Sequence, residues 1–176
     1  LYRNRGHRIF EDKTDEAGVR DGAWGWATAF FDYDNDGDLD LIMTNGYSAP
    51  FYDFGNQWLS NPMKLWRNDG DGAFTDVSIA EGITDNGRGK GLLVFDFDKD
   101  GDLDVFVTNN ADAPVLYRNN TRHGNHWLRV KPVGSYSNRD GIGCVVTLKR
   151  DDALPVQVRE ISGGSHFLSQ SEKVCH

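Results

Sequence analysis

The sequence has little cysteine, no long apolar run and no cluster of basic residues. With only two cysteines in 176 residues, Cys144 and Cys175, the chain is not a disulfide-stapled scaffold, and whether these two pair stays open. No apolar run approaches the roughly 20 residues that a membrane-spanning helix needs. The formal net charge of −8, without a Lys/Arg cluster, argues against nucleic acid and anionic membranes as partners. We therefore expect partners that are neutral, basic or bridged by a metal ion.

The sequence also lacks a recognisable catalytic set, so we predict that the chain is not an enzyme. Residues 162–165 do not match the Gly-x-Ser-x-Gly of a nucleophile elbow, and residues 87–91 lack the spacing of a phosphate-binding loop. We expect a turn at the first segment and the entry to a strand at the second. The five histidines show no zinc-ligand spacing and are expected to be surface or hydrogen-bonded residues: His7, His123, His126, His166 and His176.

What the sequence has in excess is aspartate, concentrated in two nine-residue segments. Both follow the pattern Asp-x-Asp-x-Asp-Gly-Asp-Leu-Asp, over residues 32–40 and 96–104, and together they hold ten of the 27 acidic residues. Five carboxylates this close repel one another unless a cation lies among them, and glycine at the sixth position permits the sharp turn that brings them together. Two bound divalent ions would offset half of the net charge. The alternative that stays open is an acidic, solvated hairpin without metal.

We predict that each acidic segment binds one calcium ion. Hard oxygen ligands without His or Cys suit calcium better than zinc or copper, and magnesium usually retains more of its water. The ligands would be the carboxylates at the first, third, fifth and ninth positions and the backbone carbonyl at the seventh. The predicted ligands are Asp32, Asp34, Asp36, Asp38 and Asp40 in the first loop, and Asp96, Asp98, Asp100, Asp102 and Asp104 in the second.

These segments are not EF-hands, which need a Glu at the twelfth position and a helix on each side. The twelfth residues are Met43 and Val107, which cannot ligate calcium. Short apolar runs rich in β-forming residues flank each segment: residues 27–31 and 39–44 around the first, and residues 91–95 and 103–108 around the second. The sequence therefore predicts that each acidic loop connects two strands.

The chain contains an internal repeat. A shift of 64 residues superposes residues 1–4 on residues 65–68 and the first acidic loop on the second. A third Leu-Tyr-Arg-Asn, at residues 116–119, follows after only 51 residues, because the first unit carries an insertion within residues 47–63. Each unit contains about four predicted short strands that cannot cover their own faces, which favours stacked β-propeller blades. The alternative is an open sandwich of two duplicated halves.

The motifs resemble the FG-GAP/VCBS repeats of calcium-binding β-propellers. The resemblance rests on Leu-Tyr-Arg-Asn, Phe-Thr/Glu-Asp, Ala-Gly-Val, Trp-Gly-Trp-Ala and the acidic loops. It implies the same ten calcium ligands as the spacing does. Lys99 stands at the fourth position of its loop, where the family often has Asn or Asp, but this position supplies no side-chain ligand.

After residue 120 the composition changes and a second resemblance begins. Residues 125–130, 137–143 and 163–170 resemble the ASPIC/UnbV domain, which follows FG-GAP repeats in secreted proteins similar to cartilage acidic protein and in bacterial relatives. Cys144 departs from that pattern, where a small Ala is more usual. The predicted fold is all-β: a partial β-propeller over residues 1–120 and a small C-terminal β domain, incomplete, over residues 121–176.

The resemblance implies a calcium-binding, non-catalytic module for adhesion or for binding protein or carbohydrate, located outside the cell or at its surface, with the periplasm as the alternative. Two other functions stay open: a propeller belonging to a secreted hydrolase or lyase, and a structural subunit of a surface assembly. Two and a fraction repeats cannot close a ring and would expose unpaired edges. We therefore expect a parent protein that is longer at both ends, or packing against other chains.

The best candidate for a contact surface is the aromatic insertion over residues 47–58, from Tyr47 to Trp58. Exposed aromatic side chains on a loop stack on sugar rings or anchor a protein partner. The alternative is that they fold back onto the blade. Residues 119–121, Asn-Asn-Thr, match an N-glycosylation acceptor, but Asn119 also belongs to the repeated Leu-Tyr-Arg-Asn, where a structural role is the alternative.

Overall fold

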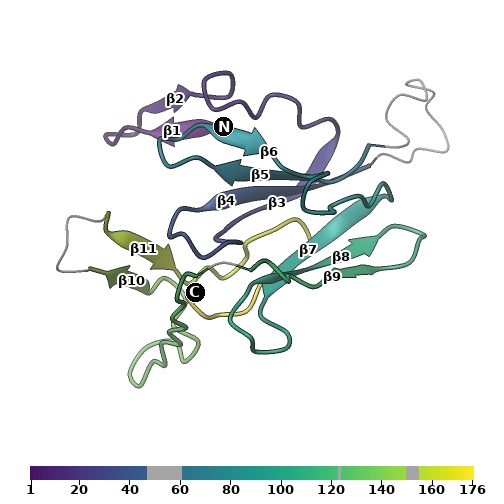
Figure 1. Cartoon of the computed structure of the whole chain (residues 1–176). Coiled ribbons are helices and arrows are strands. Elements are labelled where there is room, and N and C mark those ends of the chain that lie inside the picture. Colours follow the sequence, from purple (N-terminus) through teal and green to yellow (C-terminus); the bar gives the residue numbers. More distant parts are fainter. Residues whose placement is uncertain (47–60, 123, 150–154) are drawn as a thin grey trace.

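The computed structural model describes residues 1–46, 61–122, 124–149 and 155–176 (Figure 1). Within these ranges the chain contains strands and turns but no helix, so none is long and apolar enough to cross a membrane. This confirms the predicted all-β class. The strands are β1 (Tyr2–Asn4), β2 (Phe10–Asp12), β3 (Gly25–Phe31), β4 (Asp40–Asn45), β5 (Lys64–Asn68), β6 (Phe74–Asp76), β7 (Gly89–Phe95), β8 (Asp104–Asn109), β9 (Val115–Tyr117), β10 (Val145–Leu148) and β11 (Gln157–Glu160).

The central element is a four-stranded antiparallel sheet in the order β3-β4-β5-β6. In β3, buried Ala27, Ala29 and Phe31 alternate with the exposed residues between them, as expected for a strand with one face toward a core. Phe31 pairs with Asp40, so the first acidic segment is the connection of the β3–β4 hairpin. The β7–β8 hairpin repeats this arrangement around the second acidic segment. The predicted strand-to-strand loops are confirmed.

The structural blade is out of phase with the sequence repeat. Strands β3 and β4 come from the first sequence unit, whereas β5 and β6, which carry Leu-Trp-Arg-Asn and the Phe-centred strand, come from the second. The corresponding strands of the first unit form the separate hairpin β1–β2, and the next blade has the order β7-β8-β9. Among the described residues the sheets do not close into a ring, so the fold is a partial propeller.

The main core lies between the β3–β6 and β7–β9 sheets, and it unites buried residues of β3, β4, β5, β7 and β8. Leu92 and Val107 are fully buried from one side, and Ile42 and Met63 from the other. Gly89 permits the close approach of the two sheets, because a Cβ atom there would lie 2.9 Å from the Cβ of Thr44. The inner strands β3 and β7 are thereby fixed next to each other, each with its acidic loop (Figure 1).

The N-terminal segment covers the other face of the β3–β6 sheet. Ala17 and Val19 pack there against Leu41 and Trp66 in a second buried cluster, which partly buried Leu1, Met43 and Phe74 extend. The β3–β6 sheet is therefore covered on both faces.

The C-terminal segment contributes the two-stranded β10–β11 hairpin and irregular chain that runs back to the two blades (Figure 1). A bridge between Val130 and Cys175 joins its beginning to its end. Cys144 and Cys175 are free thiols. The insertion proposed as a contact surface, residues 47–58, lies outside the described residues.

Candidate metal centres

Each acidic loop brings three carboxylates together. One carboxylate oxygen from each of Asp32, Asp34 and Asp40 lies within 4.8 Å of the others, and Asp96, Asp98 and Asp104 form the equivalent trio. These are the first, third and ninth positions of each loop, so six of the eight side chains predicted as ligands converge. The carboxylates at the fifth position do not join the trios: Asp36 Oδ1 accepts a hydrogen bond from the amide of Asp38 at 2.8 Å, and Asp100 Oδ1 accepts one from Asp102 at 3.0 Å.

Backbone geometry explains the residues at positions four and six. Gly37 and Gly101 have φ values of +100° and +93°, in the region that favours glycine. Asn35 and Lys99, at the fourth position, are also left-handed, with φ values of 55° and 65°. Asn tolerates this conformation better than most residues, which is a physical reason for Asn at the fourth position. In the first loop Asp32 receives the amides of Asp36 and Gly37 at 3.0 and 2.9 Å, which closes the turn.

The aspartate at the ninth position is held by the Asn of the next Leu-aromatic-Arg-Asn motif. Asp40 accepts the amides of Tyr33 and Asn68 at 3.0 and 2.8 Å, and the side-chain amide of Asn68 donates to the carbonyl of Leu39 at 3.1 Å. The second loop repeats all three bonds, with Asn119 in the role of Asn68. The sequence reasoning did not find this function for the Asn, although its recurrence in every copy of the motif was the signal.

The side chain of Asn119, the first residue of the possible N-glycosylation acceptor, is engaged in hydrogen bonds. Its side-chain nitrogen donates to the carbonyl of Tyr33 at 2.7 Å and to that of Leu103 at 3.3 Å. Glycosylation would modify the same nitrogen, so the structure favours the structural alternative for Asn119.

Burial makes negative charge costly in these trios. Desolvation, reinforced by the neighbouring carboxylates, raises the pKa of Asp32 to about 6 and that of Asp40 to about 7, although backbone amides oppose the shift. The pKa of Asp104 is also raised by burial. Keeping Asp32 and Asp40 ionised near neutral pH therefore costs free energy, which a cation among the carboxylates would offset.

The second loop provides a direct test of whether a cation fits. The side chain of Asp96 is fully buried, its Oδ2 lies 3.3 Å from Nη1 of Arg129, and its Oδ1 has no hydrogen-bond partner among the described residues. A buried carboxylate oxygen without a donor is strongly unfavourable. A cation held by the Asp96, Asp98 and Asp104 trio would satisfy it. Because every converging ligand atom is a carboxylate oxygen, the donor set fits calcium.

The two loops lie side by side. The side-chain amide of Asn35 donates to the carbonyl of Gly101 at 3.3 Å and to the carboxylate of Asp102 at 3.0 Å. In the second loop, Arg118 lies 2.8 Å from the carboxylate of Asp98 and thereby offsets part of its charge. The corresponding arginine in the preceding copy, Arg67, pairs instead with Asp69. The two arginines at this position of the motif therefore make different ion pairs.

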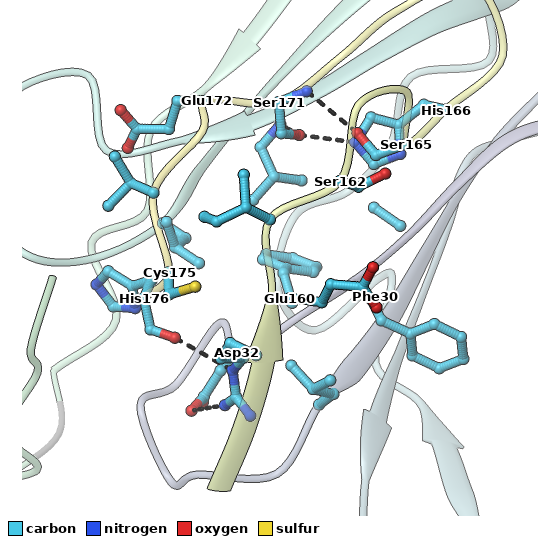
Figure 2. Close-up of a pocket in the computed structure, with 18 of the residues that line it drawn as sticks. Phe30, Asp32, Glu160, Ser162, Ser165, His166, Ser171, Glu172, Cys175 and His176 are labelled. Carbon is cyan, nitrogen blue, oxygen red and sulfur yellow. Dashed lines mark hydrogen bonds and ion pairs between the residues drawn. The ribbon is translucent and has the colours of Figure 1, made fainter. Parts of the chain in front are cut away.

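A cavity of about 450 Å³ lies beside the first loop, between β3 and the C-terminal segment (Figure 2). Within it, Nε2 of His166 contacts the hydroxyl of Ser171 at 2.7 Å (Figure 2). Nδ1 of the same ring contacts the carbonyl of Thr28 at 2.9 Å. The pair resembles a nucleophile and its base, but the Ser171 hydroxyl also accepts the amide of Val94 at 2.9 Å. Together with Ser169, which binds the backbone of Leu92, it caps the edge of β7.

The fold and the loops define a class of protein: antiparallel blades, stacked with their acidic hairpin loops at one end, followed by a small β segment. Two family models match in that order. The model described as FG-GAP-like repeat covers residues 54–107, which include the second acidic loop, and the model described as ASPIC and UnbV covers residues 134–176. Both resemblances inferred from the motifs are thereby confirmed.

The chain is also similar to individual curated proteins. The chain is 30% identical over 156 residues to "Cartilage acidic protein 1" of Homo sapiens, an alignment that covers 82% of this chain and 21% of the relative. The proteins of the same name from Mus musculus and Xenopus tropicalis are also 30% identical, with 22% of each relative covered. The chain thus spans about a fifth of the length of the curated relatives that it matches.

Proposed function

We propose that this chain is a calcium-binding, non-catalytic module in which each acidic loop holds one calcium ion. The observation that carries the proposal is the carboxylate trio, present twice with two of its three aspartates buried, together with the unsatisfied Oδ1 of Asp96 in the second copy. Asp32, Asp34 and Asp40 would hold the first ion and Asp96, Asp98 and Asp104 the second. The carboxylates of Asp36 and Asp100 and the carbonyls of Asp38 and Asp102 are the further ligands that we propose, because they belong to the same turns.

Calcium in these loops is structural in our proposal. An ion held by residues from both ends of a hairpin connection closes the loop and fixes the directions in which the two strands leave it. Sites of this kind are useful outside the cell, where free calcium is about 1 mM and dissociation constants of roughly 10⁻⁴ to 10⁻³ M suffice. Together with the family resemblance, this supports a location outside the cell or at its surface.

The ligand of the module is a protein or a carbohydrate in our proposal. The net charge of −8, without a cluster of Lys and Arg residues, supports this choice over nucleic acid. We also propose the division into residues 1–120 and 121–176, which is supported by the change in strand pattern after β9 and by the start of the ASPIC and UnbV match at residue 134. The hydroxyls of Ser169 and Ser171, engaged in capping β7, favour a non-catalytic role over the hydrolase alternative.

Titration calorimetry with calcium tests the proposal on the full chain. We expect two sites, and we expect Asp34→Asn and Asp98→Asn each to abolish one of them, because each removes a charged member of one trio. Asp21→Asn, at an exposed aspartate outside both loops, is the matched control and should retain two sites. Absence of calcium binding in the unsubstituted chain at 10 mM calcium would contradict the proposal.

A further inference from the structure

The C-terminal segment contacts both acidic loops, and it does so at equivalent positions. An arginine from this segment reaches the first aspartate of each loop: Nη2 of Arg159 lies 3.5 Å from the carboxylate of Asp32, and Nη1 of Arg129 lies 3.3 Å from that of Asp96. Both guanidinium groups are largely buried, with 17% and 24% of their side chains exposed. Ion pairs this sheltered are screened less than surface pairs, and removal of one partner is costly.

The backbone of each loop is contacted at its sixth position. Nη2 of Arg159 donates to the carbonyl of Gly37 at 3.3 Å, and Nε2 of His176 contacts the carbonyl of Gly101 at 2.8 Å. The side-chain amide of Asn125 adds a bond to the carbonyl of Asp34 at 3.1 Å. These carbonyls point toward the C-terminal segment in the turn conformation that each loop adopts around its trio.

Both sixth-position glycines also allow close packing. A Cβ atom at Gly101 would lie 1.8 Å from Nε1 of Trp127, and one at Gly37 would lie 2.3 Å from Nε2 of Gln157. Trp127 stacks on the ring of His176, with the ring centroids 6.2 Å apart. In β11, residues 157 and 159 share one face because side chains alternate along a strand, and this face lies against the first loop.

We propose that calcium binding to the two loops and docking of the C-terminal segment onto them are thermodynamically coupled, with Arg129 and Arg159 as positioning residues. The proposal rests on the calcium sites proposed above. Calcium would fix the turns whose carbonyls and first aspartates the segment contacts, and the docked segment would in turn hold those turns in the form that binds calcium. Such coupling is reciprocal, so each partner strengthens the other by the same factor.

Repulsion between calcium and the arginines would weaken the coupling, but the net negative charge of each loop outweighs it. Each loop carries five aspartates, and a bound calcium ion offsets two of the five charges. The loop therefore remains negative and still attracts a guanidinium group. In addition, the two carboxylate oxygens of Asp96 have different surroundings. Oδ2 faces Arg129, whereas the buried Oδ1 has no hydrogen-bond partner among the described residues and can bind a cation. Residues that orient metal ligands in this way typically raise the affinity for the metal.

Hydrogen exchange of the full chain, with calcium and with chelator, tests the coupling. The informative amide is that of Leu92 in β7, which donates to the hydroxyl of Ser169 at 3.0 Å and becomes free when the segment leaves. We expect calcium to slow its exchange, while the amides of β1 and β2, which among the described strands pair with each other alone, change little. Unchanged exchange at Leu92 under saturating calcium would overturn the coupling, and this comparison needs no substituted chain.

Calcium titration of Arg159→Ala and Arg129→Ala provides the reciprocal measurement. We expect each variant to bind calcium roughly 5- to 150-fold more weakly at the loop that the arginine contacts, the usual range for coupled sites. Arg20→Ala is the matched control, because it removes the same charge from an exposed ion pair with Asp15. Unchanged or tighter binding in both variants would overturn the proposal, whereas absence of calcium binding in the unsubstituted chain would overturn the proposed function itself.

Discussion

Removal of calcium by a chelator should lower the melting temperature of the full chain, because two of the three carboxylates in each trio are buried and the ion no longer offsets their mutual repulsion. The mechanism is local. Without the ion, Asp32, Asp34 and Asp40 must either take up protons or separate, and separation opens the β3–β4 hairpin where it is clamped by Asn68. In the second loop the same repulsion acts on Asp96, Asp98 and Asp104, and Arg118 offsets part of it at Asp98.

The expected magnitude follows from mass action. With dissociation constants of about 10⁻⁴ to 10⁻³ M, roughly 1 mM calcium stabilises the fold by about 0.4 to 1.4 kcal/mol per site. Two sites therefore contribute about 0.8 to 2.8 kcal/mol to the free energy of unfolding. For a chain of this length, 1 kcal/mol corresponds to roughly 2 to 4 °C, so chelation should lower the melting temperature by about 2 to 11 °C.

The assay is thermal unfolding with calcium and with chelator, on the full chain and on four loop variants. Asp34→Asn and Asp98→Asn should each reproduce part of the drop and respond less to chelation, because each removes one member of a trio. Asp36→Ala and Asp100→Ala then test whether the fifth-position carboxylate is a ligand or only closes the turn through its bond to the following amide. An unchanged melting temperature on chelation, with no calcium in the purified protein, would refute the reasoning.

Three further predictions concern protons, the Asn clamp and the sixth-position glycine. Calcium affinity should fall as the pH drops below about 7, because burial raises the pKa of Asp40 to about 7 and protons then compete with the ion; titration calorimetry at pH 7.5 and 6 checks this. In chelator, by contrast, the free energy of unfolding should rise as the pH falls from about 7 toward about 4. The reason is that the raised pKa values of Asp32 and Asp40 make the folded state bind protons more tightly than the unfolded state does. Asn68→Ala should lower the free energy of unfolding by about 1 kcal/mol in urea, the usual value of one hydrogen bond. Gly101→Ala should lower the melting temperature more than Gly72→Ala, because both residues have positive φ but only at position 101 would the new Cβ collide with Trp127.

The acidic loops could be predicted from the sequence because the residues that form each loop are consecutive in the chain. Nine consecutive residues carry the charge, the glycine and the spacing, and the strands that flank them are adjacent in the chain. The hairpins follow from these features alone, and the structure confirms them through the pairing of Phe31 with Asp40 and of Phe95 with Asp104. The repeat likewise gave the number and type of strands.

The phase of the blades and the contacts of the loops could not be predicted in this way. A repeat fixes a period but not the point at which one blade ends, and the decisive pairing, of β4 with β5, joins strands on either side of the insertion. The contacts of the C-terminal segment join residues far apart in sequence, 91 residues for Asn125 with Asp34 and 122 residues for Arg159 with Gly37. No local pattern marks an arginine as the partner of a distant carboxylate.

The packing of the blades explains why one short segment can contact both loops. Strands β3 and β7 are adjacent, run into their acidic loops in the same way, and are held together by a common core. Both loops therefore emerge at the same end of the fold, where Asn35 links them directly. At the other end of these strands, β4 and β7 approach each other closely at Gly89, so a larger residue there would push one blade away from the other. The surface that the C-terminal segment recognises thus depends on the core between the blades as much as on the loops themselves.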